Sequence, residues 1–121
     1  HTNNAPKTID RIIDAFPANE QAQIRTMLAE CLQAVVSQLL CRKKAGGRVA
    51  CHEILLWTEG LPNTIREGQI SNIRTIIEAN KGMGMRSMDG GLKELFMNDV
   101  ISAEEAYMKA SDKKLFVDYL D

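Results

Sequence analysis

Two glycines near the middle of the chain limit its fold more than any other feature. They lie in Ala45-Gly46-Gly47, between two runs rich in apolar residues, Leu39–Lys44 and Arg48–Trp57. A connection this short folds the chain back on itself, and glycine adopts the positive φ angles that such turns require. The sequence therefore predicts a two-stranded antiparallel hairpin.

The three cysteines lie ten residues apart, at positions 31, 41 and 51. An odd number at this spacing matches neither a disulfide framework nor the close pairs of ligands that bind zinc. If Lys44 faces Arg48 in the hairpin, Cys41 lies opposite Cys51, where a cross-strand disulfide is geometrically conceivable. We favour two small, half-buried thiols in a reducing compartment.

Apolar residues at helical spacing predict helices on both sides of the hairpin. Ile9–Phe16 place one apolar face before Pro17, and a longer pattern predicts a helix over 18–38. Further helices are predicted at 62–67, from about 70 to 80, around 92–96, at 103–110 and in the tail 115–120. Ser102 and Glu105 have the spacing of a capping box. The predicted fold is mainly α with one two-stranded antiparallel hairpin.

Length and charge exclude several classes of protein. A chain of 121 residues, of which 45% are hydrophobic and 26% charged, is long enough for a single globular core. Lys and Arg number 15 against 16 Asp and Glu, so the net charge of −1 attracts neither nucleic acid nor anionic lipid. No stretch approaches the roughly 18 apolar residues of a membrane-spanning helix. We predict a chain that binds no nucleic acid and does not insert into a membrane.

Motifs for metal or nucleotide binding are incomplete. His52-Glu53 lacks a second histidine one helical turn later, where Leu56 stands, so no metal site is predicted. Gly82-x-Gly84 lacks the third glycine of a dinucleotide fingerprint. The chain has no Gly-Lys dipeptide, which a phosphate-gripping loop requires. These residues alone do not make a nucleotide site.

Two surface features are compatible with a non-enzymatic function. Met83, Met85 and Met88 give the loop before a predicted helix an adaptable surface, although packing of the loop explains them as well. A basic cluster lies at the predicted hairpin turn, where it is either solvated or in contact with a phosphate-rich partner or an acidic neighbouring subunit. One hypothesis is therefore a helical protein-interaction module that binds through the methionine loop and the helix at 62–67.

Four strings of residues suggest a different class of protein. They are His1–Pro17, Gln23–Glu30, Gly46–Ala50 with His52–Ile54, and Asn63–Gly68. In unbroken order, they resemble segments of the type IV pilus retraction ATPases, the PilT family of twitching-motility motors. The likeness extends from residue 1 to about residue 110.

The resemblance implies a RecA-like α/β P-loop ATPase that assembles as a homohexamer. Such a motor is cytoplasmic and peripheral at the inner membrane, contacts the pilus platform protein there, and hydrolyses ATP with Mg²⁺ to retract the pilus. Its phosphate-binding loop precedes the segment matched here, so the chain corresponds to the carboxy-terminal part. Residues 1–57 are then the end of the ATPase core, and 58–121 are a carboxy-terminal helical domain. Alone, the chain is expected to bind no cofactor and to be inactive.

A related secretion or pilus-assembly ATPase is the neighbouring alternative. Such motors commonly carry a four-cysteine zinc site, and three cysteines at positions 31, 41 and 51 do not provide one. The resemblance therefore favours retraction.

The resemblance also assigns roles to residues near the start of the chain. His1 corresponds to the His-box histidine, a catalytic and nucleotide-binding residue on the γ-phosphate side, with Thr2 and Asn3 in support. An imidazole can donate a hydrogen bond to a phosphate oxygen. Arg11 is assigned to ion pairing within or between subunits.

A second motif lies after the hairpin and is associated with retraction in the family. The matching residues are Asn63, Ile65, Arg66 and Glu67. Pro62 stands where the family motif has arginine, and Thr64 where it has leucine. Loss of the arginine removes a fixed charge and five hydrogen-bond donors, so the contacts of the motif differ in this chain.

Overall fold

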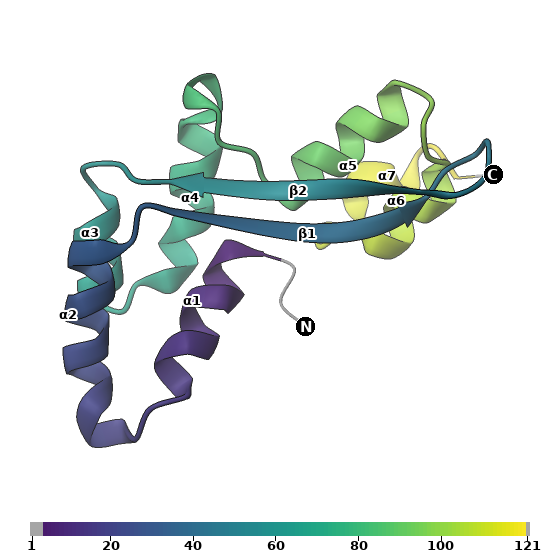
Figure 1. Cartoon of the computed structure of the whole chain (residues 1–121). Coiled ribbons are helices and arrows are strands. Elements are labelled where there is room, and N and C mark those ends of the chain that lie inside the picture. Colours follow the sequence, from purple (N-terminus) through teal and green to yellow (C-terminus); the bar gives the residue numbers. More distant parts are fainter. Residues whose placement is uncertain (1–3, 121) are drawn as a thin grey trace.

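A long β-hairpin runs through the middle of the molecule, with helices packed at both of its ends (Figure 1). The computed structural model describes residues 4–120. Strand β1 (Ala34–Arg42) pairs antiparallel with β2 (Arg48–Leu56). Gly46 and Gly47 have φ angles of 103° and 76° in the turn, which L-residues with side chains rarely adopt. The predicted hairpin is confirmed.

Seven α-helices are present in the described chain. They are α1 (Ala5–Asp14), α2 (Gln21–Cys31), α3 (Leu61–Arg66), α4 (Ile73–Ala79), α5 (Met88–Met97), α6 (Ala103–Lys109) and α7 (Lys114–Val117). Short 3₁₀ turns lie at Ala18–Glu20, Ile70–Asn72 and Lys81–Met83. The predicted class, mainly α with one two-stranded sheet, is confirmed. No helix among residues 4–120 is both long and apolar enough to cross a membrane.

The predicted register of the hairpin is wrong by two residues. Arg42 pairs with Arg48, so Cys41 lies opposite Val49 and Cys51 opposite Leu39. The turn closes early because Lys43 N donates to Gly47 O at 3.0 Å. Lys44 N donates instead to Val100 O at 2.9 Å, a tertiary bond that sequence spacing does not reveal. All three cysteines are free, so no cross-strand disulfide forms.

The predicted helix over 18–38 is also wrong, because the chain becomes extended after Cys31. Leu32 has ψ 123°, and β1 begins at Ala34. Val35 and Leu39 are four residues apart, which fits one face of a helix and equally one face of a strand. β-Branched Val35 and Val36 favour the strand, and pairing with β2 satisfies its backbone hydrogen bonds.

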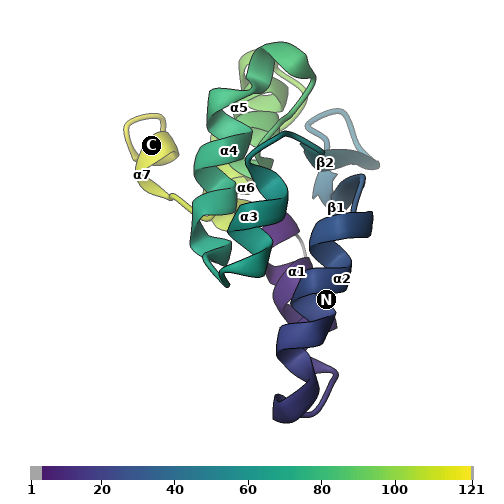
Figure 2. The ribbon, with the colours of Figure 1, turned by 90° about the vertical axis from the view of Figure 1, so that its left-hand side faces the viewer.

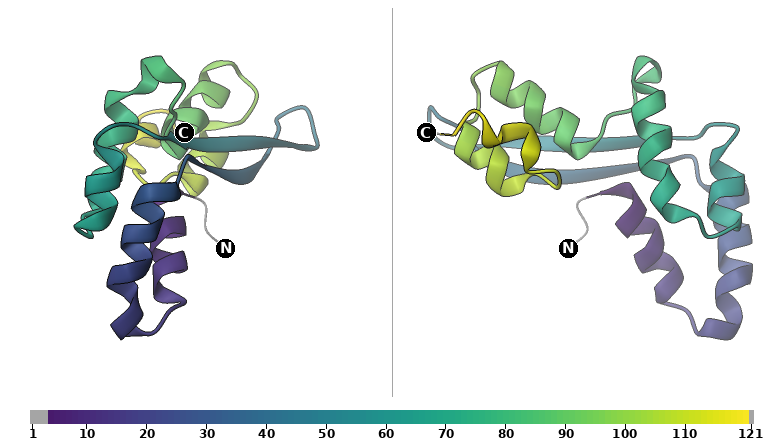
Figure 3. Two further views of the ribbon diagram at one scale, coloured as in Figure 1. Left: turned by 60° about the vertical axis from the view of Figure 1, so that its left-hand side comes forward. Right: turned by 180° about the vertical axis from the view of Figure 1, so that it is seen from behind.

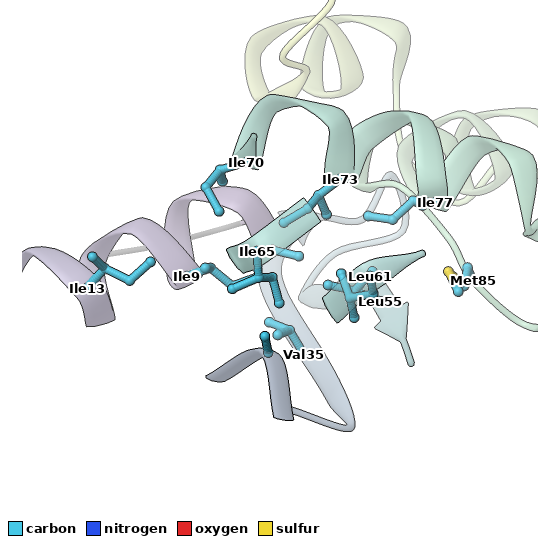
Figure 4. Packing of buried hydrophobic residues seen from close by; sticks show 12 residues of the cluster. Ile9, Ile13, Val35, Leu55, Leu61, Ile65, Ile70, Ile73, Ile77 and Met85 are labelled. Atoms are coloured by element: carbon cyan, nitrogen blue, oxygen red, sulfur yellow. The ribbon is translucent and has the colours of Figure 1, made fainter. Parts of the chain in front are cut away.

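Buried apolar side chains form two clusters along the hairpin. The first core contains Ala5, Ile9, Ile13, Ala29, Val35, Leu55, Leu61, Ile65, Ile70, Ile73, Ile77 and Met85 (Figure 4). The second core contains Cys41, Cys51, Met88, Leu92, Ile101, Ala106, Ala110 and Phe116. Helices α1 to α4 lie at the open end of the hairpin, and α5 to α7 lie toward its turn (Figures 2 and 3). Both cores take residues from each side of the predicted boundary between 57 and 58, which stays a prediction.

Helix α5 approaches the hairpin closely at Gly91. A Cβ atom there would lie 2.7 Å from Cys51 Sγ and 3.3 Å from His52 O. Glycine is therefore required for α5 to pack directly on β2.

Helix α6 has only half of the predicted capping box. Ser102 Oγ accepts from Glu105 N at 3.1 Å, as expected. The Glu105 carboxylate does not return to Ser102 but accepts from Arg42 N at 2.6 Å. This bond and the bond from Lys44 N hold the turn end of the hairpin against the second core.

Candidate functional site

A buried carboxylate in the middle of β2 holds the starts of two helices. Glu53 is 6% exposed. Its Oε2 accepts from Ala5 N at 2.5 Å, and its Oε1 accepts from Met88 N at 2.9 Å. Ala5 and Met88 are the first residues of α1 and α5, whose N–H groups have no partner within the helix. The negative charge also stabilises the partial positive charge at each helix start. We call this arrangement the Glu53 junction.

A second buried carboxylate lies next to the junction, in the first turn of α5. Asp89 accepts from Ser111 N at 2.8 Å, from Asp112 N at 3.0 Å and from Arg74 Nη2 at 3.1 Å. These bonds connect α5 to α4 and to the loop between α6 and α7. Asp89 therefore fixes the position of three segments that are distant in sequence.

A cavity of about 300 Å³ adjoins both carboxylates, between α1, α4 and α5. Lys7 and Arg74 contribute positive charge to its lining, and Ser71 and Ser111 contribute hydroxyl groups. Residues 4–120 contain no group of three or more His, Cys, Asp or Glu that could hold a metal ion. Both carboxylates are hydrogen-bonded to backbone N–H groups, so they organise the fold around the cavity.

Burial raises the thiol pKa of both buried cysteines. Burial raises the pKa of the Cys51 thiol from 9.0 to about 12, and Cys41 adds to the effect. Burial also raises the pKa of Cys41, with a further contribution from Glu105. Because the thiolate is the reactive form, both side chains remain inert near neutral pH.

The residues assigned to the His box, His1, Thr2 and Asn3, lie outside the described residues. The structure begins at Asn4, whose Oδ1 accepts from Lys7 N at 2.9 Å and caps α1. Asn4 thus satisfies one of the N–H groups at the start of α1 that have no partner within the helix. Ala5, whose N–H donates to Glu53, is two residues after the predicted His box along the chain.

Arg11 lies on the exposed face of α1. No salt bridge of its guanidinium is found among residues 4–120. Its assignment to ion pairing, within or between subunits, stays a prediction.

The retraction-motif residues Asn63, Ile65 and Arg66 lie on α3, and Glu67 follows directly after it, at the open end of the hairpin and away from the junction (Figure 1). Ile65 is fully buried in the first core, whereas Asn63, Arg66 and Glu67 are exposed. Arg66 Nη1 donates to Asn63 Oδ1 at 3.4 Å. The matched segment 63–67 therefore presents three polar side chains to solvent, apart from the Glu53 junction (Figure 1).

Sequence reasoning missed both carboxylates of this region. Glu53 was weighed only as half of a metal motif, although it alternates with Cys51 and Leu55 on one face of a strand. That alternation is a signal for a buried carboxylate that needs partners. Asp89 had a weaker signal, an acidic residue in the first turn of a helix.

Comparisons with known proteins identify relatives of the chain. No protein-family model matches it. It is 46% identical over 110 residues to the type IV pilus retraction ATPase PilT of Pseudomonas aeruginosa, covering 91% of this chain and 32% of the relative. It is 42% identical over 115 residues to the twitching motility protein of Neisseria gonorrhoeae, covering 94% and 31%.

A solved structure agrees with these relatives. The crystal structure of the pilus retraction motor PilT with bound ADP matches with a TM-score of 0.81 and 36% identity, covering 95% of this chain and 32% of that one. The chain thus spans about a third of the length of the relatives it matches.

Proposed function

Because this chain belongs to the family of PilT-like type IV pilus retraction ATPases, we propose that it is the carboxy-terminal part of a motor that retracts the pilus and drives twitching motility. The observation that carries the proposal is agreement at two levels over nearly the whole chain. Sequence identity reaches 46%, and the fold matches a retraction motor with a TM-score of 0.81. A helical interaction module of unrelated origin would explain neither the sequence identity nor the matching fold.

The proposed protein hydrolyses ATP with Mg²⁺ and works as a cytoplasmic homohexamer, peripheral at the inner membrane, where it contacts the platform of the pilus. The chain lacks the Gly-Lys dipeptide of a phosphate-binding loop. The chemistry of ATP therefore requires segments outside this chain. The chain contributes the His box, subunit contacts and the helices that transmit force.

Within this proposal, His1 detects the γ-phosphate, with Thr2 and Asn3 beside it. Support comes from the short distance along the chain between His1 and the start of α1, which Asn4 and Glu53 hold in place. A group that contacts His1 acts close to a helix whose position is fixed by the hairpin. The exposed residues Asn63, Arg66 and Glu67 on α3 are available for contacts with other parts of the machine.

The test compares catalysis with folding in the full-length protein. His1→Ala is expected to lower ATP turnover about 100-fold, the scale of losing one positioned hydrogen-bonding group, while thermal unfolding shifts by less than about 2 °C. The isolated chain of 121 residues is expected to show no ATP hydrolysis. Turnover unchanged by His1→Ala, or hydrolysis by the isolated chain, contradicts the proposal.

A further inference from the structure

The two outer edges of the hairpin differ in their backbone hydrogen bonds. On the outer edge of β2, Ile54 N donates to Arg86 O at 2.7 Å, and Arg86 N donates to Ile54 O at 3.1 Å. These two bonds form a short β-bridge between β2 and the loop before α5. The edge of β2 is therefore already paired with another segment of this chain at Ile54.

The ladder between the strands shows which groups of β1 face its outer edge. Lys43 N donates to Gly47 O at 3.0 Å, and Trp57 N donates to Gln33 O at 2.9 Å. Bonded pairs alternate along an antiparallel ladder, so the odd-numbered residues of β1 bond to β2 throughout the register. The N–H and C=O groups of the even-numbered residues therefore point to the outer edge.

Helix α6 closes this edge of β1 near the turn and leaves it open farther along. Arg42 N donates to a carboxylate of α6 at 2.6 Å, and Leu40 O accepts from Lys109 Nζ at 3.0 Å. The edge-facing backbone groups of Val36 and Gln38 have no hydrogen-bond partner among residues 4–120. A strand edge with free N–H and C=O groups is a template for pairing with another extended segment.

The side chains beside the open edge are apolar and exposed. Val36 is 63% exposed and Leu40 is 45% exposed, on the face of the sheet opposite to the buried residues of β1. Figure 2 shows helices α3 to α7 on one side of the hairpin, so they do not cover this face. Proteins keep open apolar strand edges covered, because such edges aggregate. The edge therefore indicates a further strand in the complete protein.

Ser37, between Val36 and Gln38, gives independent support. Its side chain is 5% exposed, and its Oγ has no hydrogen-bond partner in the described part of the chain. Buried hydroxyls are nearly always hydrogen-bonded, since an unpaired one costs folding free energy. A strand added beside β1 places a residue next to Ser37 on the same face, where a polar side chain can bond to the hydroxyl. The hydroxyl without a partner and the open edge thus lie at the same point of β1.

We propose that the edge of β1 over residues 34–40 pairs with a strand from the part of the polypeptide that precedes residue 1. This step rests on the proposed function, because only a longer protein has such a segment. The chain spans about a third of the length of the relatives it matches. Ala5 N is held by Glu53, and α1 contacts β1, so the chain enters α1 beside the hairpin (Figure 1). A segment ahead of α1 therefore has a short way to the open edge.

The open edge also defines the kind of strand that fits it. Val36, Gln38 and Leu40 are uncharged, so the added strand carries apolar side chains on this face, and β-branched residues suit such positions. On the opposite face, the residue beside Ser37 has a hydrogen-bonding side chain. The centre of the strand has no charged residue, because burying an unpaired charge is unfavourable.

The test compares amide hydrogen exchange in the full-length protein and in the 121-residue chain, by mass spectrometry with fragmentation to single residues. Val36 and Gln38 are expected to exchange about 100-fold more slowly in the full-length protein, because their N–H groups gain acceptors there. Leu39, whose N–H faces β2, is the control and is expected to be protected in both. Equal exchange of Val36 and Gln38 in the two proteins overturns the inference, and so does protection of both in the 121-residue chain alone.

Two proline variants separate strand pairing from simple burial. Gln38→Pro removes an N–H that faces the open edge, and Leu39→Pro removes one that faces β2. In the 121-residue chain, Gln38→Pro is expected to shift thermal unfolding by less than about 3 °C, and Leu39→Pro to lower it by about 10 °C or more. In the full-length protein, Gln38→Pro is expected to return exchange at Val36 to the rate of the shorter chain. If Val36 stays protected there, burial alone protects it and the added strand fails.

A photo-activated cross-linker identifies the segment that pairs with β1. In the full-length variant Val36→p-benzoylphenylalanine, illumination is expected to join residue 36 to a peptide from before residue 1. Because this cross-link lies within one polypeptide, the product migrates as a monomer under denaturing conditions. A cross-link to residues 4–120 of a second copy, or to another protein, overturns the inference.

The exchange measurements and the motor activity fail separately. If the full-length protein hydrolyses ATP while Val36 and Gln38 stay unprotected, the added strand fails and the proposed function stands. If both amides are protected and the protein hydrolyses no ATP, the proposed function fails and the added strand stands.

Discussion

The two cores of this molecule are built differently although they share one hairpin. The first core is almost entirely aliphatic, with Ile9, Ile65, Ile73 and their neighbours contributed by α1 to α4. The second core has smaller side chains and two thiols, with Phe116 packed edge-to-face on Phe96 at a centroid distance of 6.0 Å.

Buried carboxylates accompany the second core, which has fewer buried apolar residues than the first. Asp89 holds the loop after α6, and Glu105 holds the end of β1 through Arg42 N. Glu53 and Asp89 also bond to helices of the first core, Glu53 to the start of α1 and Asp89 to Arg74 of α4. Where helices are short and side chains small, hydrogen bonds to backbone N–H groups fix the arrangement that aliphatic packing fixes elsewhere.

The largest expected effect is in the first core. Ile73 is fully buried, so Ile73→Ala leaves a cavity and is expected to lower the free energy of unfolding by about 3 kcal/mol. Urea unfolding followed by circular dichroism measures the change. Met97→Ala, at a side chain 64% exposed, is the control and is expected to cost less than about 0.5 kcal/mol. A loss below about 1 kcal/mol for Ile73→Ala contradicts the aliphatic character of this core.

A smaller effect is expected in the second core and tests the contribution of carboxylates. Asp89→Ala leaves Ser111 N and Asp112 N without their acceptor and is expected to cost about 2 kcal/mol in unfolding free energy. Exchange of the amides at 110–113 should accelerate while α1 and α2 remain protected. Glu94→Ala, which removes an exposed partner of Arg86, should cost under about 1 kcal/mol. Equal costs for the two variants contradict the comparison.

The smallest expected effect is a pH dependence specific to the second core. In the folded chain the pKa of Cys51 is raised to about 12, mainly by burial, whereas the unfolded thiol titrates near 9.0. The contribution of the Cys51 thiol to the free energy of unfolding is fully present below about pH 9. It is lost as the pH rises from about 9 toward 12, because only the unfolded state then loses the proton. Unfolding free energies measured from about pH 8 to 10 should fall less steeply in Cys51→Ala than in the parent chain. If the unfolding free energies of Cys51→Ala and of the parent chain fall equally with pH, the raised pKa of Cys51 is contradicted.

Local patterns predicted much of the fold. Gly46 and Gly47 predicted the turn, and Ser102 predicted the start of α6, because each acts through the local backbone. The register failed because it depends on Lys44 N and Val100 O, which are far apart in sequence. The predicted helix over 18–38 was wrong because apolar residues four apart fit one face of a helix and equally one face of a strand.

The site was less predictable than the fold for the same reason. Glu53 and Asp89 act through backbone N–H groups of distant segments, and such partners leave no pattern near the residue itself. Ile65 was predicted as part of a functional motif and lies in the first core, because a helix with exposed polar residues also needs an apolar anchor.

The hairpin that carries both cores also has mechanical consequences. Each strand has nine residues, which at about 3.4 Å per residue gives a stiff two-stranded beam of roughly 30 Å. The turn end is held by hydrogen bonds from Arg42 N and Lys44 N, and aliphatic side chains of the first core pack on the open end. Tilting such a beam by about two degrees moves its far tip by roughly 1 Å. The hairpin thus links the two cores rigidly over this length, so a rotation imposed at one core would be transmitted to the other.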